Sequence, residues 1–335
     1  MTALRQPRPR VVALGGGHGL AASLSALRRV TRELTAIVTV ADDGGSSGRL
    51  RRQYGVLPPG DLRMALAALC GDDAWGTTWS KVVQHRLGGL PGVPAPDPAG
   101  PAAADRLSGH AVGNLLIVAL WELLGDPVQG LDWVGRLLGA HGRVLPMASV
   151  PLDLVAEVEG ADPARPDDLS TVRGQVACAS TTGRVRSLSL VPADPPACAE
   201  AVAAVGEADW VVLGPGSWFT SVIPHLLVPD LAAALVGTRA RRLVALNLAP
   251  QPGETAGFAP HTHLEVLADH APGLVIDIVL ADRAAAAGTT AELEKAAGLL
   301  GGRLVLADLA MGDGTPRHDP RRMAGAFAQV FKGER

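Results

Sequence analysis

Short runs of apolar residues recur along the chain and alternate with longer helical patterns. These runs cover residues 11–14, 36–40, 210–213, 242–246, 274–280 and 304–306. An uninterrupted apolar run of this length is typical of a strand buried on both faces, as in a parallel sheet covered by helices. The alternation therefore predicts a three-layer, Rossmann-like α/β fold with a mostly parallel sheet.

The pattern changes between residues 144 and 191. Short alternating runs at 152–158, 172–178 and 185–190 indicate strands with one buried face, and so a small β-rich insertion. The insertion is too short to bury a core of its own, so we expect a single α/β domain over residues 10–332. Residues 88–106, rich in Pro and Ala, are expected to form a flexible loop, and residues 1–9 a disordered basic tail.

Composition limits the classes of partner. The 335 residues are 47% hydrophobic but only 3% aromatic, so the core is built from Ala, Val and Leu. A net charge of −3 without a long basic run argues against nucleic acid, and no apolar run is long enough for a membrane span. Three scattered cysteines and no signal peptide favour the reducing cytoplasm, with buried, inert thiols.

A glycine-rich turn joins the first apolar run to an Ala/Leu-rich helical stretch. The turn consists of Gly15, Gly16, Gly17, His18 and Gly19. Glycines in such a turn let backbone amides approach a phosphate at the start of a helix. The match to the dinucleotide fingerprint G-x-G-x-x-G is imperfect, because Leu20 stands where the third glycine belongs. No Walker A lysine follows, which argues against an NTPase.

A second polar loop follows the next apolar run. Its predicted ligand-binding residues are Asp42, Asp43, Gly44, Gly45, Ser46 and Ser47. Two acids leading into an anion-binding nest suit a phosphorylated ligand approached from two loops. Asp42 and Asp43 would hold Mg²⁺ beside phosphates, or one would bind a sugar hydroxyl while the other shapes the loop. Both alternatives stay open, so Mg²⁺ is the one cofactor considered.

Further polar residues follow other predicted elements. Gly214, Gly216 and Ser217 form a second glycine turn, whose amides could also hold an anion, and Asn247 ends the next strand. Asp61 is placed to cap the helix that begins at Leu62. His110 is predicted to open a helix carrying Asn114 four residues later, so both would face one site. These residues are predicted to meet at the carboxyl edge of the sheet, where open α/β sheets bind ligands.

Several segments together resemble the YvcK family of bacterial gluconeogenesis factors, which is related to the CofD 2-phospho-L-lactate transferases. They read LGGGHGLA, VTVADDGGSSGRLR, LPPGDLR, LSGHAVGNLL, VLGPGSWFTSVIPHLLVP, NLAPQPGET and RHDP, in the family's order and over nearly the whole chain. The sequence departs from the family at His18, where a threonine is usual, and at Trp218-Phe219, which replaces a Leu/Tyr pair.

The resemblance implies a cytoplasmic regulator that binds a UDP-sugar, notably UDP-N-acetylglucosamine, or another nucleotide. Such a regulator links gluconeogenic carbon metabolism to peptidoglycan precursor synthesis and cell shape. The implied partner is glucosamine-6-phosphate synthase, and the sequence leaves a homo-oligomer open. The alternative is an Mg²⁺-dependent, CofD-like transferase of a phospholactyl-type group from a nucleotide diphosphate, with Asp43 and His110 as catalytic residues. A third alternative, an NAD dehydrogenase, lacks an evident catalytic His/Asp or Tyr/Lys arrangement.

Overall fold

The chain folds around a seven-stranded parallel sheet with the strand order β10-β9-β8-β7-β1-β2-β3. The computed structural model describes residues 8–88, 107–162, 164–165, 167–251 and 253–333. The strands are β1 (Val11–Gly15), β2 (Leu34–Val38), β3 (Arg143–Pro146), β7 (Trp210–Leu213), β8 (Arg241–Ala245), β9 (Ile278–Asp282) and β10 (Arg303–Ala307). The predicted Rossmann-like fold is confirmed.

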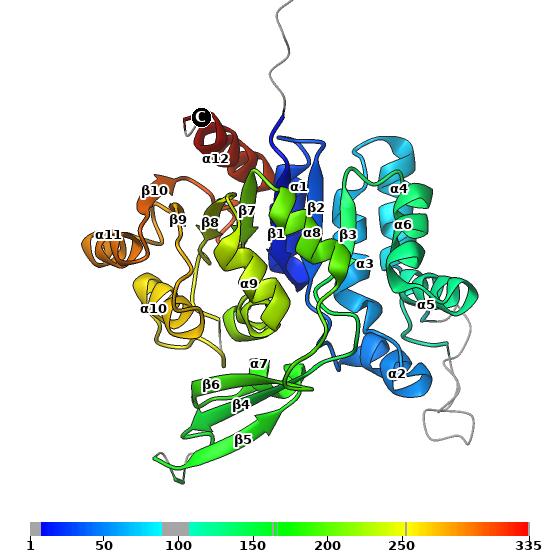
Figure 1. Ribbon diagram of the computed structural model, residues 1–335, viewed down its shortest axis with the longest axis horizontal. Helices are drawn as coiled ribbons and strands as arrows, with labels where there is room; N and C mark the ends of the chain where they lie inside the picture. The colour runs from blue at the N-terminus through cyan, green and yellow to red at the C-terminus, as the bar shows by residue number, and fades with distance from the viewer. Residues whose placement is uncertain (1–7, 89–106, 163, 166, 252, 334–335) are drawn as a thin grey trace, which may run out of the picture.

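Helices cover both faces of this sheet (Figure 1). They are α1 (Gly17–Leu27), α2 (Gly45–Tyr54), α3 (Pro59–Leu69), α4 (Ala74–Gln84), α5 (Val112–Leu124), α6 (Pro127–Leu138), α8 (Ala199–Glu207), α9 (Pro229–Gly237), α10 (Pro260–His270), α11 (Thr290–Leu299) and α12 (Pro320–Gly333). Helix α1 packs against α3 and α12, while α8 packs against α9. Two short helical turns, η1 (Trp218–Val222) and η2 (Ile223–Leu227), follow β7.

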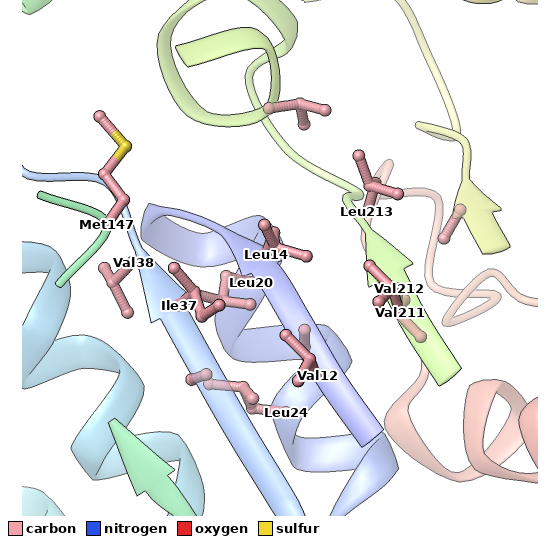
Figure 2. Close-up of a cluster of buried hydrophobic side chains, with 14 of the residues drawn as sticks. Val12, Leu14, Leu20, Leu24, Ile37, Val38, Met147, Val211, Val212 and Leu213 are labelled. Atoms are coloured by element: carbon pink, nitrogen blue, oxygen red, sulfur yellow. The ribbon is translucent and has the colours of Figure 1, made fainter. Parts of the chain in front are cut away.

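The core consists mainly of aliphatic side chains, as the low aromatic content predicts. All five residues of β1 are buried, because helices cover both sides of the strand. Figure 2 shows Val12 and Leu14 of β1 close to Leu20 and Leu24 of α1. Packing of this kind holds the end of β1 and the start of α1 in a fixed relation, which positions the glycine turn between them.

The β-rich insertion is a separate three-stranded antiparallel sheet, β4 (Asp153–Glu159), β5 (Leu169–Arg173) and β6 (Arg184–Val191), in the order β5-β4-β6. It lies beyond the carboxyl ends of the main strands, at the bottom of Figure 1. Two expectations were wrong. Residues 144–146 pair with β2 in the main sheet, and residues 175–180 form helix α7 (Gln175–Ser180) instead of continuing a strand.

Strand β7 has its predicted bounds, and other strand boundaries move by a few residues. The run at 274–280 becomes a strand only from Ile278, because residues 274–276 have no regular structure and residue 277 forms a bend. The expected loop at 88–106 and the tail at 1–9 fall largely outside the described residues. Among the described residues, no single helix has the length and apolarity to cross a membrane; only η1–η2 and α9, bent by 84°, meet both criteria as a pair.

Candidate functional site

The strand order reverses direction between β1 and β7, and open α/β sheets bind ligands in the crevice outside the carboxyl ends of the strands at such a switch point. The two glycine turns meet at this point. A Cβ atom on Gly19 would lie only 2.7 Å from the backbone nitrogen of Gly216. Glycine at position 19 is therefore required by the close approach of the two backbones.

A carboxylate of the chain itself holds the start of α1. Asp61 accepts a hydrogen bond from the amide of Gly17, and its Oδ2 lies 3.4 Å from the hydroxyl of Thr39. Burial and the neighbouring charge of Asp42 raise the pKa of Asp61 to about 7, although both hydrogen bonds oppose the rise. The prediction that Asp61 caps its own helix was wrong, because α3 already begins at Pro59.

Asp42 and Asp43 point in different directions. Asp42 accepts from the amide of Gly44 at 2.9 Å, and burial, its largest influence, raises its pKa. Asp43 accepts from the amide of Val176 at 3.1 Å and so caps helix α7 of the insertion. One acid therefore stays in the crevice beside Asp61, while the other fastens the insertion to the main domain.

His110 and Asn114 meet at one hydroxyl. Helix α5 begins only at Val112, so His110 precedes the helix and does not open it as predicted. His110 Nδ1 and Asn114 Nδ2 each lie 3.0 Å from Ser46 Oγ. Burial and two nearby guanidinium groups lower the pKa of His110, which favours its neutral form. The hydroxyl of Ser47 accepts from the amide of Gly60 at 3.0 Å, which ties α2 to α3.

The second glycine turn differs from what we expected. The amide of Gly214 donates to the carbonyl of Leu14 at 3.2 Å, and at the start of η1 Glu254 accepts from the amides of Phe219 and Thr220 at 2.8 and 2.9 Å. The amide of Gly216 donates to Asn247 Oδ1 at 2.8 Å. Ser217 does cap η1, as predicted, and donates its hydroxyl to Glu254 at 2.6 Å.

Glu254 was missed by the sequence analysis. It is 4% exposed, and burial raises its pKa although three backbone amides and a hydroxyl hold the carboxylate. The signal available was its position in the segment NLAPQPGET, in the polar loop after β8.

The remaining predicted residues lie around the same crevice. Gly44 and Gly45 form the start of α2, and His18 is exposed in the first turn of α1.

Magnesium typically binds one or two carboxylates and completes its shell with phosphate oxygens and water. Asp42 and Asp61 would supply such carboxylates. Among the described residues, no group of three or more His, Cys, Asp or Glu side chains is arranged to hold a metal.

A cavity of about 470 Å³ lies at the opposite, amino end of the sheet, beside Val11 and Leu34. Two of its three arginines are paired with acids: Arg10 contacts Glu207 at 3.7 Å, and Arg143 contacts Asp132 at 2.8 Å. Because open α/β sheets bind ligands at the carboxyl ends of their strands, we place the functional site at the carboxyl edge.

Known proteins share this architecture. The sequence family described as 2-phospho-L-lactate transferase CofD matches residues 11–301. A Mycobacterium leprae protein named "Putative gluconeogenesis factor" is 53% identical over 327 residues, which cover 97% of this chain and 87% of that protein. The "Gluconeogenesis factor" of Halalkalibacterium halodurans is 35% identical over 273 residues, 82% of this chain and 77% of that one.

A solved structure agrees with the sequence relationships. The crystal structure of a UPF0052 family member from Bacillus halodurans has a TM-score of 0.79 and 31% identity to this chain. The match covers 95% of this chain and 98% of that one. Sequence identity over most of the chain and a shared overall fold place the chain in one family: it belongs to the gluconeogenesis factor (YvcK) proteins, within the wider CofD family.

Proposed function

We propose that the protein binds a UDP-sugar, with UDP-N-acetylglucosamine as the first candidate, in the crevice between the two glycine turns and the insertion. In this proposal it is a cytoplasmic regulator that links gluconeogenic carbon supply to peptidoglycan precursor synthesis and cell shape. Family membership supports this role, and glucosamine-6-phosphate synthase is its proposed partner.

The acids in the crevice support a sugar ligand. Asp42 and Asp61 are partly buried and lie at the switch point of the sheet, where ligands of this fold class bind. Carboxylates accept hydrogen bonds from sugar hydroxyls, or they hold Mg²⁺ against a diphosphate. Because the insertion reaches the same edge through Asp43, a bound ligand would lie between the sheet and the insertion.

One observation favours binding without turnover: the candidate proton-transfer groups are already engaged. His110 contacts the Ser46 hydroxyl, Asp43 caps α7, and Glu254 holds the start of η1. Proton transfer by any of these groups would first require it to leave its partner within the chain, which supports binding without turnover.

Asp61 favours the alternative, an Mg²⁺-dependent, CofD-like transferase. A carboxylate with a pKa of about 7 is suited to general base catalysis near neutral pH. In that reaction the acceptor hydroxyl forms a new bond to a phosphorus atom of the donor, the bond from that phosphorus to the departing nucleotide breaks, and Asp61 takes the hydroxyl proton. Mg²⁺ would neutralise charge on the phosphates.

One experiment distinguishes the regulator from the transferase. Incubate the protein with UDP-N-acetylglucosamine and Mg²⁺, measure binding by calorimetry, and follow UDP, UMP and phosphate by chromatography over hours. The regulator predicts saturable binding with the ligand recovered intact. Steady product formation that stops in Asp61→Asn would establish the transferase instead. Absence of any binding would reject both for this ligand.

A further inference from the structure

Three arginines lie close together near α2, α3 and the start of α5: Arg49 in α2, Arg63 in α3 and Arg86 just after α4. Arg49 donates to the carbonyl of Ser108 and Arg86 to that of Gly109, each at 3.0 Å. Both arginines act on His110, whose pKa they help to lower. Arg86 also acts electrostatically on Arg63, which brings all three cations into one neighbourhood.

Arg63 is the buried member of this group. Its side chain is 5% exposed, and its stem packs against Gly113, where a Cβ atom would lie 2.8 Å from Arg63 Cγ. Its Nε has no hydrogen-bond partner among the described residues. A buried guanidinium nitrogen without a hydrogen-bond partner is costly, because it loses water and nothing replaces it.

Several other arginines of the described chain pair directly with an acid. Arg28, Arg51 and Arg143, for example, each contact a carboxylate at 2.5 to 2.8 Å. Arg63, by contrast, interacts electrostatically with Asp61 and Asp42 but has no hydrogen bond to either. No direct ion pair is found at Arg49, Arg63 or Arg86 among the described residues, so the positive charge of Arg63 stays available beside Asp42 and Asp61.

We infer that Arg63, supported by Arg86 and Arg49, binds a phosphate group of the ligand. This inference rests on the proposed function and assigns its phosphate end. The glycine turns hold less of the phosphate than their sequence implies, because Asp61 occupies the Gly17 amide, and Glu254 those of Phe219 and Thr220. Arginine suits phosphate because its planar guanidinium donates two parallel hydrogen bonds.

The arrangement also orients the ligand. Phosphate oxygens lie against the arginines, and the hydroxyl-bearing part, or Mg²⁺, lies against Asp42 and Asp61. Phosphate placed directly on those carboxylates without a metal would meet like charge. Because Arg63 and the two acids are neighbours, the phosphate and the hydroxyl-bearing part or Mg²⁺ would lie side by side in one site.

Calorimetry with UDP, uridine and inorganic pyrophosphate tests the inference. Arg63→Gln keeps a polar side chain but removes the charge, so binding of UDP and pyrophosphate should weaken about ten- to a hundredfold. Uridine carries no phosphate, and its affinity should stay the same. Arg32→Gln removes an exposed charge at the other end of the sheet and serves as the matched control, with unchanged affinity for all three.

A folded Arg63→Gln protein that binds pyrophosphate as tightly as the parent overturns the inference. If Arg63→Gln fails to fold, exposed Arg86→Gln replaces it, with an expected loss of about threefold and a weaker dependence of affinity on salt. Unchanged affinity and salt dependence in that variant also overturn the inference. A parent that binds pyrophosphate but no UDP-sugar rejects the proposed function while the arginine subsite stands.

Discussion

Carboxylates that hold backbone amides recur around this site. Asp61 holds the start of α1, Asp43 the start of α7, and Glu254 the start of η1. Each places a negative group at the end of a helix where unpaired amides carry partial positive charge. The protein thus stabilises its loops with the same interaction that a phosphate would make, which leaves the arginines to bind the ligand's charge.

The raised pKa of Asp61 predicts a pH dependence of stability. The folded protein keeps a proton up to about pH 7, whereas the unfolded chain releases it near 3.8, so this carboxyl makes stability fall as pH rises through that interval. Asp61→Asn has no proton to release and lacks this fall. Urea unfolding from about pH 4 to pH 8 should show the variant gaining roughly 2–4 kcal/mol relative to the parent. Parallel curves would show that Asp61 titrates normally.

Glu254 gives a separate prediction about stability. Glu254→Ala leaves the amides of Phe219 and Thr220 and the hydroxyl of Ser217 buried without their acceptor. The free energy of unfolding should drop by about 2–4 kcal/mol, as expected when several buried donors lose one partner. Chemical denaturation measures the loss, and Glu265→Ala, at an exposed position of α10, is the control. A loss no larger than in the control would mean that water replaces the carboxylate.

At the scale of elements, the sequence predicted what depends on local patterns. Strand β7 was placed at its observed bounds, because the apolar run is flanked by polar residues and a glycine turn. The end of the strand predicted at 172–178 was wrong, because residues 175–180 form a helix whose first amides are held by Asp43, far away in the sequence. A hydrogen bond between residues so far apart in the sequence leaves no pattern in the residues around the helix.

The candidate site shows the same limit. The glycine turns and the acids were visible in the sequence, because turn chemistry and strand ends are local features. The sequence did not show which group each acid would contact. It also did not show that Arg63 would be buried. Both features depend on the packing of α3 beside the end of β2. The expectation of free amides at the second glycine turn failed for this reason.

The cap on α7 makes the insertion sensitive to one residue. Asp43→Ala removes the acceptor for the Val176 amide, which should weaken the helix by about 1 kcal/mol and raise amide hydrogen exchange in residues 174–180. Asp43→Asn retains an acceptor oxygen and should exchange almost as slowly as the parent. Main-sheet amides in β1 and β7 should be unaffected in both variants. Equal exchange in the alanine and asparagine variants would contradict the capping role.

At the scale of the whole molecule, the site joins two parts of unequal rigidity. The seven-stranded sheet is buried on both faces through most of its strands, whereas the insertion exposes one face and is held by few polar contacts. Asp153 adds one of these contacts, because it pairs with Arg51 of α2 and with Arg173 of β5, each at 2.6 Å. A ligand in the crevice would add contacts to both parts.

Ligand binding should therefore stabilise the main domain and the insertion together. How long this stabilisation lasts distinguishes a regulator from an enzyme. At a free UDP-N-acetylglucosamine concentration one hundred times Kd, the free energy of unfolding should rise by about 2.7 kcal/mol. Thermal unfolding should show the increase, and hydrogen exchange should slow in the insertion as well as in the glycine turns.

A regulator keeps this stabilisation unchanged for hours at constant ligand, because nothing is consumed. A transferase supplied with an acceptor loses it as the donor is converted, and Asp61→Asn would restore the lasting effect. Stabilisation that decays in the parent but persists in that variant would replace the regulatory proposal with the catalytic one.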